Sequence, residues 1–120
     1  MAQEMVSVIM PSFNSGKHLT DSIDSILNQT YRNFELLITD DNSNDADTIS
    51  TLKRYSEKDE RVKLLLLENN KGPGYSRDKS IERAQGRYIA FCDSDDAKYG
   101  NLRLMDNLLG VGAVAGSQNR

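Results

Sequence analysis

The chain has 120 residues, with 18 acidic and 15 basic side chains and a formal net charge of −3, a length that suits one domain with a single hydrophobic core. This charge balance offers no basic face for nucleic acid, and the apolar runs are too short to cross a bilayer. The single cysteine, Cys92, excludes an internal disulfide and a cysteine zinc cage.

The first part of the chain predicts a strand, a helix and a second strand. Residues 6–10 (VSVIM) and 34–39 (FELLIT) are continuous apolar runs, which are typical of strands covered on both faces. Between them, apolar side chains recur at the spacing of one helical face, at Leu19, Ile23, Ile26 and Leu27. Asn14 or Ser15 could cap this helix at its start.

A second helix and a third strand follow. The apolar face of the helix comprises Ile49, Leu52 and Tyr55, and Asn44 or Asp45 could cap its first turn. The run VKLLLL at 62–67 then predicts the third strand.

The last part of the chain predicts one more helix and one more strand. The helix opens at Pro73 and Gly74, runs through about Ala84 and is stopped by Gly86, and the run YIAFC at 88–92 predicts the fourth strand. A further helix is expected near Asn101, and the glycine-containing tail at 110–120 is expected to be a mobile end. The order β-α-β-α-β-α-β predicts an α/β fold with an open, mostly parallel sheet and flanking helices.

A polar loop follows each predicted strand. Because ligands of open parallel sheets bind outside the carboxyl ends of the strands, these loops are expected to converge on one edge. They are PSFNSG (11–16), DDNSND (40–45), ENNKGPGYSR (68–77) and DSDD (93–96). Each loop alone could be an ordinary turn or helix cap, so a functional interpretation depends on their convergence.

The fourth loop crowds Asp93, Asp95 and Asp96 into four positions, and carboxylates about 4 Å apart repel by about 4 kcal/mol near a protein surface. An EF-hand counted from Asp93 fails, because Lys98 and Leu104 occupy its glycine and bidentate-acid positions. P-loop and GxGxxG sequences are absent. A divalent cation held by carboxylates and by the phosphates of a substrate fits the remaining facts and would offset the repulsion.

Three segments resemble the nucleotide-binding half of GT-A-fold glycosyltransferases of family 2: VSVIMPSFN, SILNQTYRNFELLITDDNSND and GRYIAFCDSDD. The resemblance covers about residues 5–100. It implies a domain at 1–100 that binds a nucleotide-diphosphosugar, followed by a divergent tail at 101–120.

The resemblance also implies roles for single residues in the first two loops. Pro11, Ser12 and Phe13 match the loop that holds the nucleoside, with Phe13 where the family usually has tyrosine. Asp41 matches the aspartate that hydrogen-bonds the nucleotide base, and Asp40 is expected to support the loop.

The other two loops match the part of the family site that holds the diphosphate. Arg77 matches a basic residue near the base and the phosphates, although YSRD replaces the commoner AARN. Asp93 and Asp95 match the DxD motif, which implies Asp95 as the direct metal ligand and Asp93 as a helper through the ribose, the metal or a water. Asp96 is expected to be a helix cap or a sugar contact.

The implied activity is transfer of a sugar from a nucleotide-diphosphate donor, UDP-linked by expectation, to an acceptor hydroxyl, with Mn²⁺ or Mg²⁺ as cofactor. The acceptor is an unknown glycan or lipid-linked molecule, as in polysaccharide biosynthesis, and nucleic acid is not expected as a partner.

The match to the family stops after about Tyr99, and the general base is expected in an acceptor-binding half that these residues do not include. No catalytic residue is identified, so we expect donor binding with weak or absent transfer by this chain alone. Two alternatives stay open: a non-catalytic nucleotide-sugar-binding module, and a partner-dependent fragment whose exposed sheet edge is covered by self-association. The single cysteine and the absence of a secretory-signal pattern at the start of the sequence suit a cytoplasmic protein, held at the inner face of a membrane only through partners.

Overall fold

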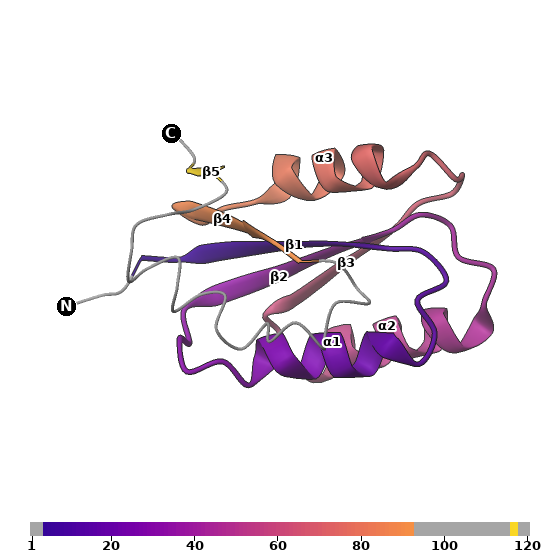
Figure 1. Ribbon diagram of the computed structural model, residues 1–120, viewed down its shortest axis with the longest axis horizontal. Helices are drawn as coiled ribbons and strands as arrows, with labels where there is room; N and C mark the ends of the chain where they lie inside the picture. Colours follow the sequence, from indigo (N-terminus) through magenta and orange to yellow (C-terminus); the bar gives the residue numbers. More distant parts are fainter. Residues whose placement is uncertain (1–3, 93–115, 118–120) are drawn as a thin grey trace.

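The computed structural model describes residues 4–92 and 116–117, and within these residues the strands form one sheet (Figure 1). Its order is β3-β2-β1-β4-β5. The parallel strands are β1 (Val6–Ser12), β2 (Phe34–Asp40), β3 (Val62–Leu66) and β4 (Tyr88–Phe91). The short β5 (Gly116–Ser117) pairs antiparallel with β4. The predicted open, mostly parallel α/β sheet is therefore confirmed.

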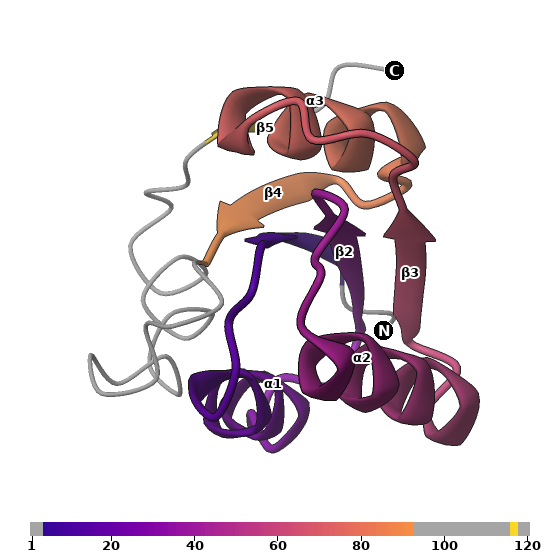
Figure 2. The same cartoon turned by 90° about the vertical axis from the view of Figure 1, so that its right-hand side faces the viewer.

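Helices cover both faces of this sheet. Helices α1 (His18–Leu27) and α2 (Ala46–Lys58) lie together on one face, and α3 (Pro73–Arg83) lies on the other, as Figure 2 shows. In the described part of the chain, none of the helices has the length and apolar content needed to cross a membrane.

The larger hydrophobic core lies between the sheet and helices α1 and α2. Successive strand residues point to opposite faces, so alternate residues of the two central strands enter this core. Its fully buried members include Val8, Met10, Leu36, Ile38, Leu19, Ile23 and Leu52. A smaller cluster under α3 contains Ile9, Leu37, Ala84 and Ile89.

A buried acid connects the strands on the α3 face. The Glu35 carboxylate accepts hydrogen bonds from Ser7 Oγ at 2.6 Å, from the Gln85 backbone N–H at 2.7 Å and from Lys63 Nζ at 3.0 Å. Burial alone would raise the pKa of Glu35, but these donors together hold the pKa below its ordinary value. Because the donors come from β1, β3 and the segment before β4, this side chain ties three parts of the chain to β2.

The expectation of strands covered on both faces is right for β1 and β2 and wrong for β3 and β4. Strand β3 has one neighbour in the described sheet and leaves Leu66 37% exposed. Helix α3 packs against β1 and β2, so Phe91 of β4 is 39% exposed. A continuous apolar run does not reveal how far the covering helix extends.

The predicted caps have mixed outcomes. Asp45 caps α2, since its side chain accepts a hydrogen bond from the Asp47 N–H at 3.2 Å. Neither Asn14 nor Ser15 caps α1: Lys17 holds the cap position without a side-chain hydrogen bond. Asn14 is instead used between two loops, as described below.

Helix α3 begins at Pro73 as predicted, but Gly86 does not act as its stop signal. The helix ends at Arg83, close to the expected end near Ala84, and its C-cap residue is Ala84. A Cβ at Gly86 would lie 2.6 Å from Ser7 Oγ and 2.8 Å from the Met5 carbonyl oxygen. Glycine is needed there because the backbone passes close to β1.

Two expectations about the end of the chain fall outside the described residues: the helix near Asn101 and the domain division at residue 100. Strand β5 lies within the segment expected to be a mobile end, and its residues pair with Tyr88 and Ile89 of β4. The division at residue 100 stays a prediction.

Candidate functional site

The carboxyl ends of the parallel strands meet at one edge of the sheet, and backbone hydrogen bonds join the loops that leave them. The Asp41 N–H donates to the Ser12 carbonyl at 2.8 Å, and the Leu67 N–H donates to the Asp40 carbonyl at 2.9 Å. Ser12 and Asp40 are also paired in the β1–β2 register. The predicted convergence is therefore present for the loops after β1, β2 and β3.

Asp40 and Asp41 are adjacent but have different surroundings. Asp40 is fully buried. Its two carboxylate oxygens accept hydrogen bonds from the Ser43 N–H at 2.8 Å and the Ser43 hydroxyl at 2.7 Å. Asp40 therefore folds the loop that follows β2, which is the supporting role expected for it.

Asp41 instead points to the loop between β3 and α3. Its carboxylate oxygens accept hydrogen bonds from the Lys71 N–H at 2.6 Å and the Gly72 N–H at 2.8 Å, and its carbonyl accepts one from Asn70 Nδ2 at 3.1 Å. Gly72 has φ 93°, a conformation that favours glycine. Since a carboxylate has about four acceptor positions, this fixed side chain can still accept a hydrogen bond from a ligand.

Asn14 joins the loop after β1 to the loop after β2. Its N–H donates to Ser43 Oγ at 2.8 Å and its Nδ2 donates to Asn44 Oδ1 at 3.0 Å. Its Oδ1 accepts from the backbone N–H groups of Asn44 and Asp45, both at 3.1 Å. The φ of Asn14 is 47°, a left-handed conformation that asparagine tolerates better than most residues.

The other predicted residues of the first loop lie at the same edge. Phe13 is 50% exposed, so its ring is available for contact with a ligand. Ser12 is buried, with its hydroxyl 3.4 Å from that of Ser15. Pro11 is half-buried in β1, opposite Thr39 of β2.

Arg77 lies in the second turn of α3, the helix that begins directly after Gly72. It is half-buried and forms no hydrogen bond or ion pair with the residues that the structure describes. Its charge is therefore available to an anionic ligand near the start of α3.

Asp93 and Asp95, the predicted metal ligands, lie outside the described residues, as does Asp96. The described segment stops at Cys92, whose N–H donates to the Ile9 carbonyl at 3.0 Å beside β1. Across residues 4–92 and 116–117, no group of three or more acidic, histidine or cysteine side chains is placed to hold a metal ion.

Asn14 and the Lys71–Gly72 amides are the parts of this edge that sequence reasoning missed. The sequence predicts Asn14 as a possible helix cap, but an asparagine in a tight polar loop is also typical of a left-handed turn. The two amides carry no side-chain signal, because any residue other than proline supplies a backbone N–H.

The fold and the edge together define an α/β protein with a polar rim at the carboxyl ends of its strands, the place where open parallel sheets commonly bind ligands. The chain belongs to glycosyl transferase family 2, whose family model matches residues 7–101. This confirms the family that the three sequence segments resemble.

Two curated relatives show the same relationship. TuaG of Bacillus subtilis (strain 168), a glycosyltransferase named for teichuronic acid biosynthesis, is 46% identical over 92 residues, which is 77% of this chain and 36% of TuaG. The β-1,3-glucosyltransferase WfgD of Escherichia coli is 46% identical over 96 residues, which is 80% of this chain and 37% of WfgD. The chain thus spans about a third of the length of these relatives.

Solved structures match the fold. S. aureus TarS (residues 1–349) in complex with UDP superimposes with a TM-score of 0.70 at 35% identity, over 76% of this chain and 27% of TarS. The mannosyltransferase PcManGT of Pyrobaculum calidifontis, in complex with GDP-Man and Mn²⁺, gives a TM-score of 0.71 at 21% identity, over 87% of this chain and 33% of that chain. The second likeness shows the fold alone.

Proposed function

We propose that this chain forms the donor-binding part of a metal-dependent glycosyltransferase that uses a nucleotide-diphosphosugar, with UDP as the nucleotide. The observation that carries the proposal is the Asp41 carboxylate, held by two backbone N–H groups at the carboxyl edge of the sheet. Membership of family 2 and the UDP complex of TarS support it.

Recognition of the nucleoside is assigned to the loops after β1 and β2. Asp41 is 4% exposed and offers only acceptor positions when ionised, so it suits a base that presents an N–H group, as uracil does. The exposed ring of Phe13 can stack on a base or ribose, and Pro11 and Ser12 are the last two residues of β1, directly before Phe13. Asn14 fixes the relative position of these two loops.

Recognition of the diphosphate is assigned to Arg77 and to the acids after β4. Arg77 has no partner among the described residues, so its guanidinium can bind phosphate oxygens without losing another contact. Asp95 would hold Mn²⁺ or Mg²⁺ with help from Asp93, since such a cation is commonly bound by one or two carboxylates and substrate phosphates. The cation supplies charge neutralisation of the diphosphate leaving group.

Transfer itself needs an acceptor and a general base, and we assign neither to this chain. The relatives extend well beyond the region that it spans, so we propose that the whole protein transfers the sugar to a glycan or lipid-linked acceptor during polysaccharide synthesis. A cytoplasmic location follows from the same proposal, because the donor is a nucleotide sugar.

Isothermal titration calorimetry with UDP tests the proposal. Binding is expected with Mn²⁺ or Mg²⁺ and should be much weaker in EDTA. Asp95→Ala should remove most of the metal dependence, whereas Glu57→Gln, a change of an exposed acid on α2, should bind UDP like the unmodified chain. Absence of binding heat with UDP and Mn²⁺, or an unchanged affinity of Asp95→Ala, would contradict the proposal.

A further inference from the structure

A second polar pocket lies at the opposite edge of the sheet, where α1 and α2 end and β2 and β3 begin. It is a cavity of about 270 Å³, far along the strands from the rim described above. Besides Tyr55, its polar lining comprises three basic side chains, two acidic ones and an amide: Arg32, Lys58, Arg61, Asp24, Asp59 and Asn28. The formal charge of this set is +1, although the whole chain carries −3.

Arg61 is oriented by two neighbours. Its Nε and Nη2 donate to the two carboxylate oxygens of Asp59 at 3.1 and 2.8 Å, and its guanidinium lies 4.6 Å from the centre of the Phe34 ring. The hydrogen bond from Arg61 and the charges of Arg61 and Arg32 hold the pKa of Asp59 below its ordinary value. The remaining nitrogen, Nη1, has no partner among the described residues and so keeps its two N–H donors for a ligand.

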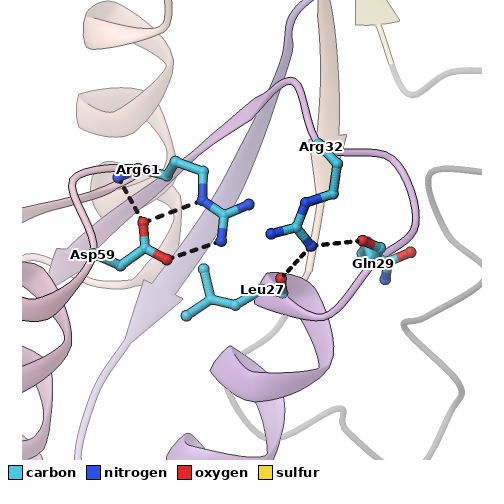
Figure 3. Close-up of polar contacts among 5 residues, drawn as sticks. All are labelled: Leu27, Gln29, Arg32, Asp59 and Arg61. Atoms are coloured by element: carbon cyan, nitrogen blue, oxygen red, sulfur yellow. Dashed lines mark hydrogen bonds and ion pairs between the residues drawn. The ribbon is translucent and has the colours of Figure 1, made fainter.

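Arg32 faces Arg61 across the pocket. Figure 3 shows the two guanidinium groups pointing toward one another above Leu27. Nη1 of Arg32 donates to the Leu27 carbonyl at 3.2 Å and the Gln29 carbonyl at 3.1 Å, near the end of α1. Carbonyl groups carry no formal charge, and Arg32 has no ion pair with the described residues. Among these residues, Asp59 and Asp24 are the acids that line the pocket beside the two cations.

Lys58 and Asn28 add further donors to the same pocket. Both are exposed, and neither side chain has a hydrogen-bond partner in the described part of the chain. Asp24 contributes a negative charge to the pocket, and its carboxylate also accepts a hydrogen bond from the Tyr55 hydroxyl at 2.6 Å. The three basic side chains outnumber the two acidic ones, so the pocket keeps an excess of positive charge.

Stabilisation of the helix ends explains only part of this arrangement. A cation near the carboxyl end of a helix interacts favourably with the helix dipole. This explains why Nη1 of Arg32 binds carbonyl groups near the end of α1 and why Lys58 lies at the end of α2. It does not account for two guanidinium groups that direct their remaining donors at each other.

We propose that this pocket binds a phosphate group, with oxygens bridging Arg32 and Arg61 and with Lys58 adding charge. The planar fork of a guanidinium matches the spacing of two phosphate oxygens, and two forks facing one another can hold one tetrahedral oxyanion. The group could belong to free inorganic phosphate or to a phosphomonoester. This site is separate from the proposed donor site and does not depend on it.

Nuclear magnetic resonance of the 120-residue chain tests the proposal, because the Nε–Hε signals of arginine and the side-chain amide of Asn28 report on the pocket itself. Inorganic phosphate and glycerol phosphate are titrated separately while KCl holds the ionic strength constant. We expect saturable shifts of the Arg32, Arg61 and Asn28 signals. Saturation by glycerol phosphate supports recognition of a phosphomonoester, and saturation by inorganic phosphate alone supports the free ion.

Three variants make the test specific. Arg32→Gln should weaken binding about tenfold, the effect of losing a hydrogen bond to a charged group, and Lys58→Gln about threefold, the effect of an exposed ion pair. Arg87→Gln is the control, since Arg87 is an exposed arginine whose guanidinium lies over the Tyr88 ring. Lys58→Gln keeps the test valid if Arg32→Gln fails to fold, because Lys58 has no partner among the described residues.

The proposal is overturned if the pocket signals shift linearly without saturation or if KCl alone reproduces the shifts. It is also overturned if Lys58→Gln and Arg32→Gln, when folded, bind phosphate as tightly as the unmodified chain.

Discussion

At the scale of single residues, Asp40 and Asp41 show how neighbours of the same type acquire different tasks. The alternation of a strand sends successive side chains to opposite faces. Asp40 therefore turns toward Ser43 and its own loop, while Asp41 reaches the amides that precede α3. Only the second carboxylate connects two loops of the candidate site, which is why we assign base recognition to Asp41.

Asn14→Gly tests the connection between the first two loops. Glycine accepts the left-handed backbone of Asn14 but loses the three side-chain hydrogen bonds to Asn44 and Asp45. We expect UDP affinity with Mg²⁺ to fall about tenfold, the equivalent of about 1.4 kcal/mol, because Phe13 and Asp41 are no longer held in one arrangement. Calorimetry below the melting temperature of the variant measures this.

Tyr55→Phe is the matched control for Asn14→Gly. It removes the hydrogen bond to Asp24 at the other edge of the sheet, where burial and that bond raise the pKa of Tyr55 to about 12. It should cost stability while leaving UDP affinity unchanged. If Asn14→Gly and the unmodified chain bind UDP with equal affinity, the hydrogen bonds of Asn14 with Asn44 and Asp45 do not contribute to UDP binding.

Two serines on the buried face of α3 give a second residue-scale prediction. Ser76 and Ser80 are both fully buried. Ser80 shares a hydrogen bond of 2.7 Å with Thr39, whereas Ser76 Oγ has no partner among the described residues. We expect Ser80→Ala to destabilise the fold by about 1 kcal/mol, and Ser76→Ala to be neutral or stabilising by up to about 1 kcal/mol.

Urea denaturation of both serine variants measures these changes as free energies of unfolding. The comparison is sharp because the two substitutions are chemically identical and lie one helical turn apart. A larger loss of stability in Ser76→Ala than in Ser80→Ala would contradict the assignment of partners.

At the scale of elements, β2 depends on the buried carboxylate of Glu35. Its folded-state pKa is lower than its ordinary value, so the unfolded chain binds the proton more readily. The stability from this carboxylate is therefore fully present above the ordinary pKa of 4.5 and is lost as the pH falls through the lower folded-state pKa. Strands β1 and β3 and the segment before β4 should loosen together below that point.

Glu35→Gln tests this dependence. At pH 7 we expect a loss of about 2 kcal/mol, because the hydrogen bonds to a charged acceptor are weakened, and a shallower fall in stability between neutral and acidic pH. Urea titrations at several pH values measure both effects, with Glu57→Gln as the exposed-acid control. If the stability of Glu35→Gln falls at acidic pH as steeply as that of the unmodified chain, this acid sensitivity comes from other groups.

A helix or strand could be predicted where a local sequence pattern specifies it. The central strands β1 and β2 follow from continuous apolar runs, and α2 and α3 begin at the residues expected from Asp45 and Pro73. Prediction failed where the partner lies far away in the sequence. Gly86 is required by its approach to Ser7 of β1, and Asn14 is used by the loop after β2 rather than by its own helix.

The candidate site was predictable to the same degree. The convergence of the loops follows from strand order, and the resemblance placed Phe13 and Asp41 on the rim. The hydrogen bonds that orient Asp41 come from the backbone N–H groups of Lys71 and Gly72. Because every residue type except proline supplies such a group, the sequence gives no signal for these bonds. The roles of Asp93 and Asp95 remain predictions.

At the scale of the whole molecule, the two edges of the sheet carry different chemistry. The carboxyl edge presents fixed acceptors, an exposed ring and Arg77, which has no partner among the described residues, and the amino edge presents facing guanidinium groups. Because the strands lie between them, ligands at the two edges do not compete for the same side chains. The chain also spans only about a third of its relatives, so we expect donor binding at the carboxyl edge with little sugar transfer.

The most direct test of that central claim is a map of backbone amide shifts on addition of UDP with Mg²⁺. We predict the largest shifts at Phe13, Asp41, Lys71, Gly72 and Arg77, with little change at the amino edge around Asp59. Shifts confined to the amino edge, or no saturable shifts at all, would contradict the account.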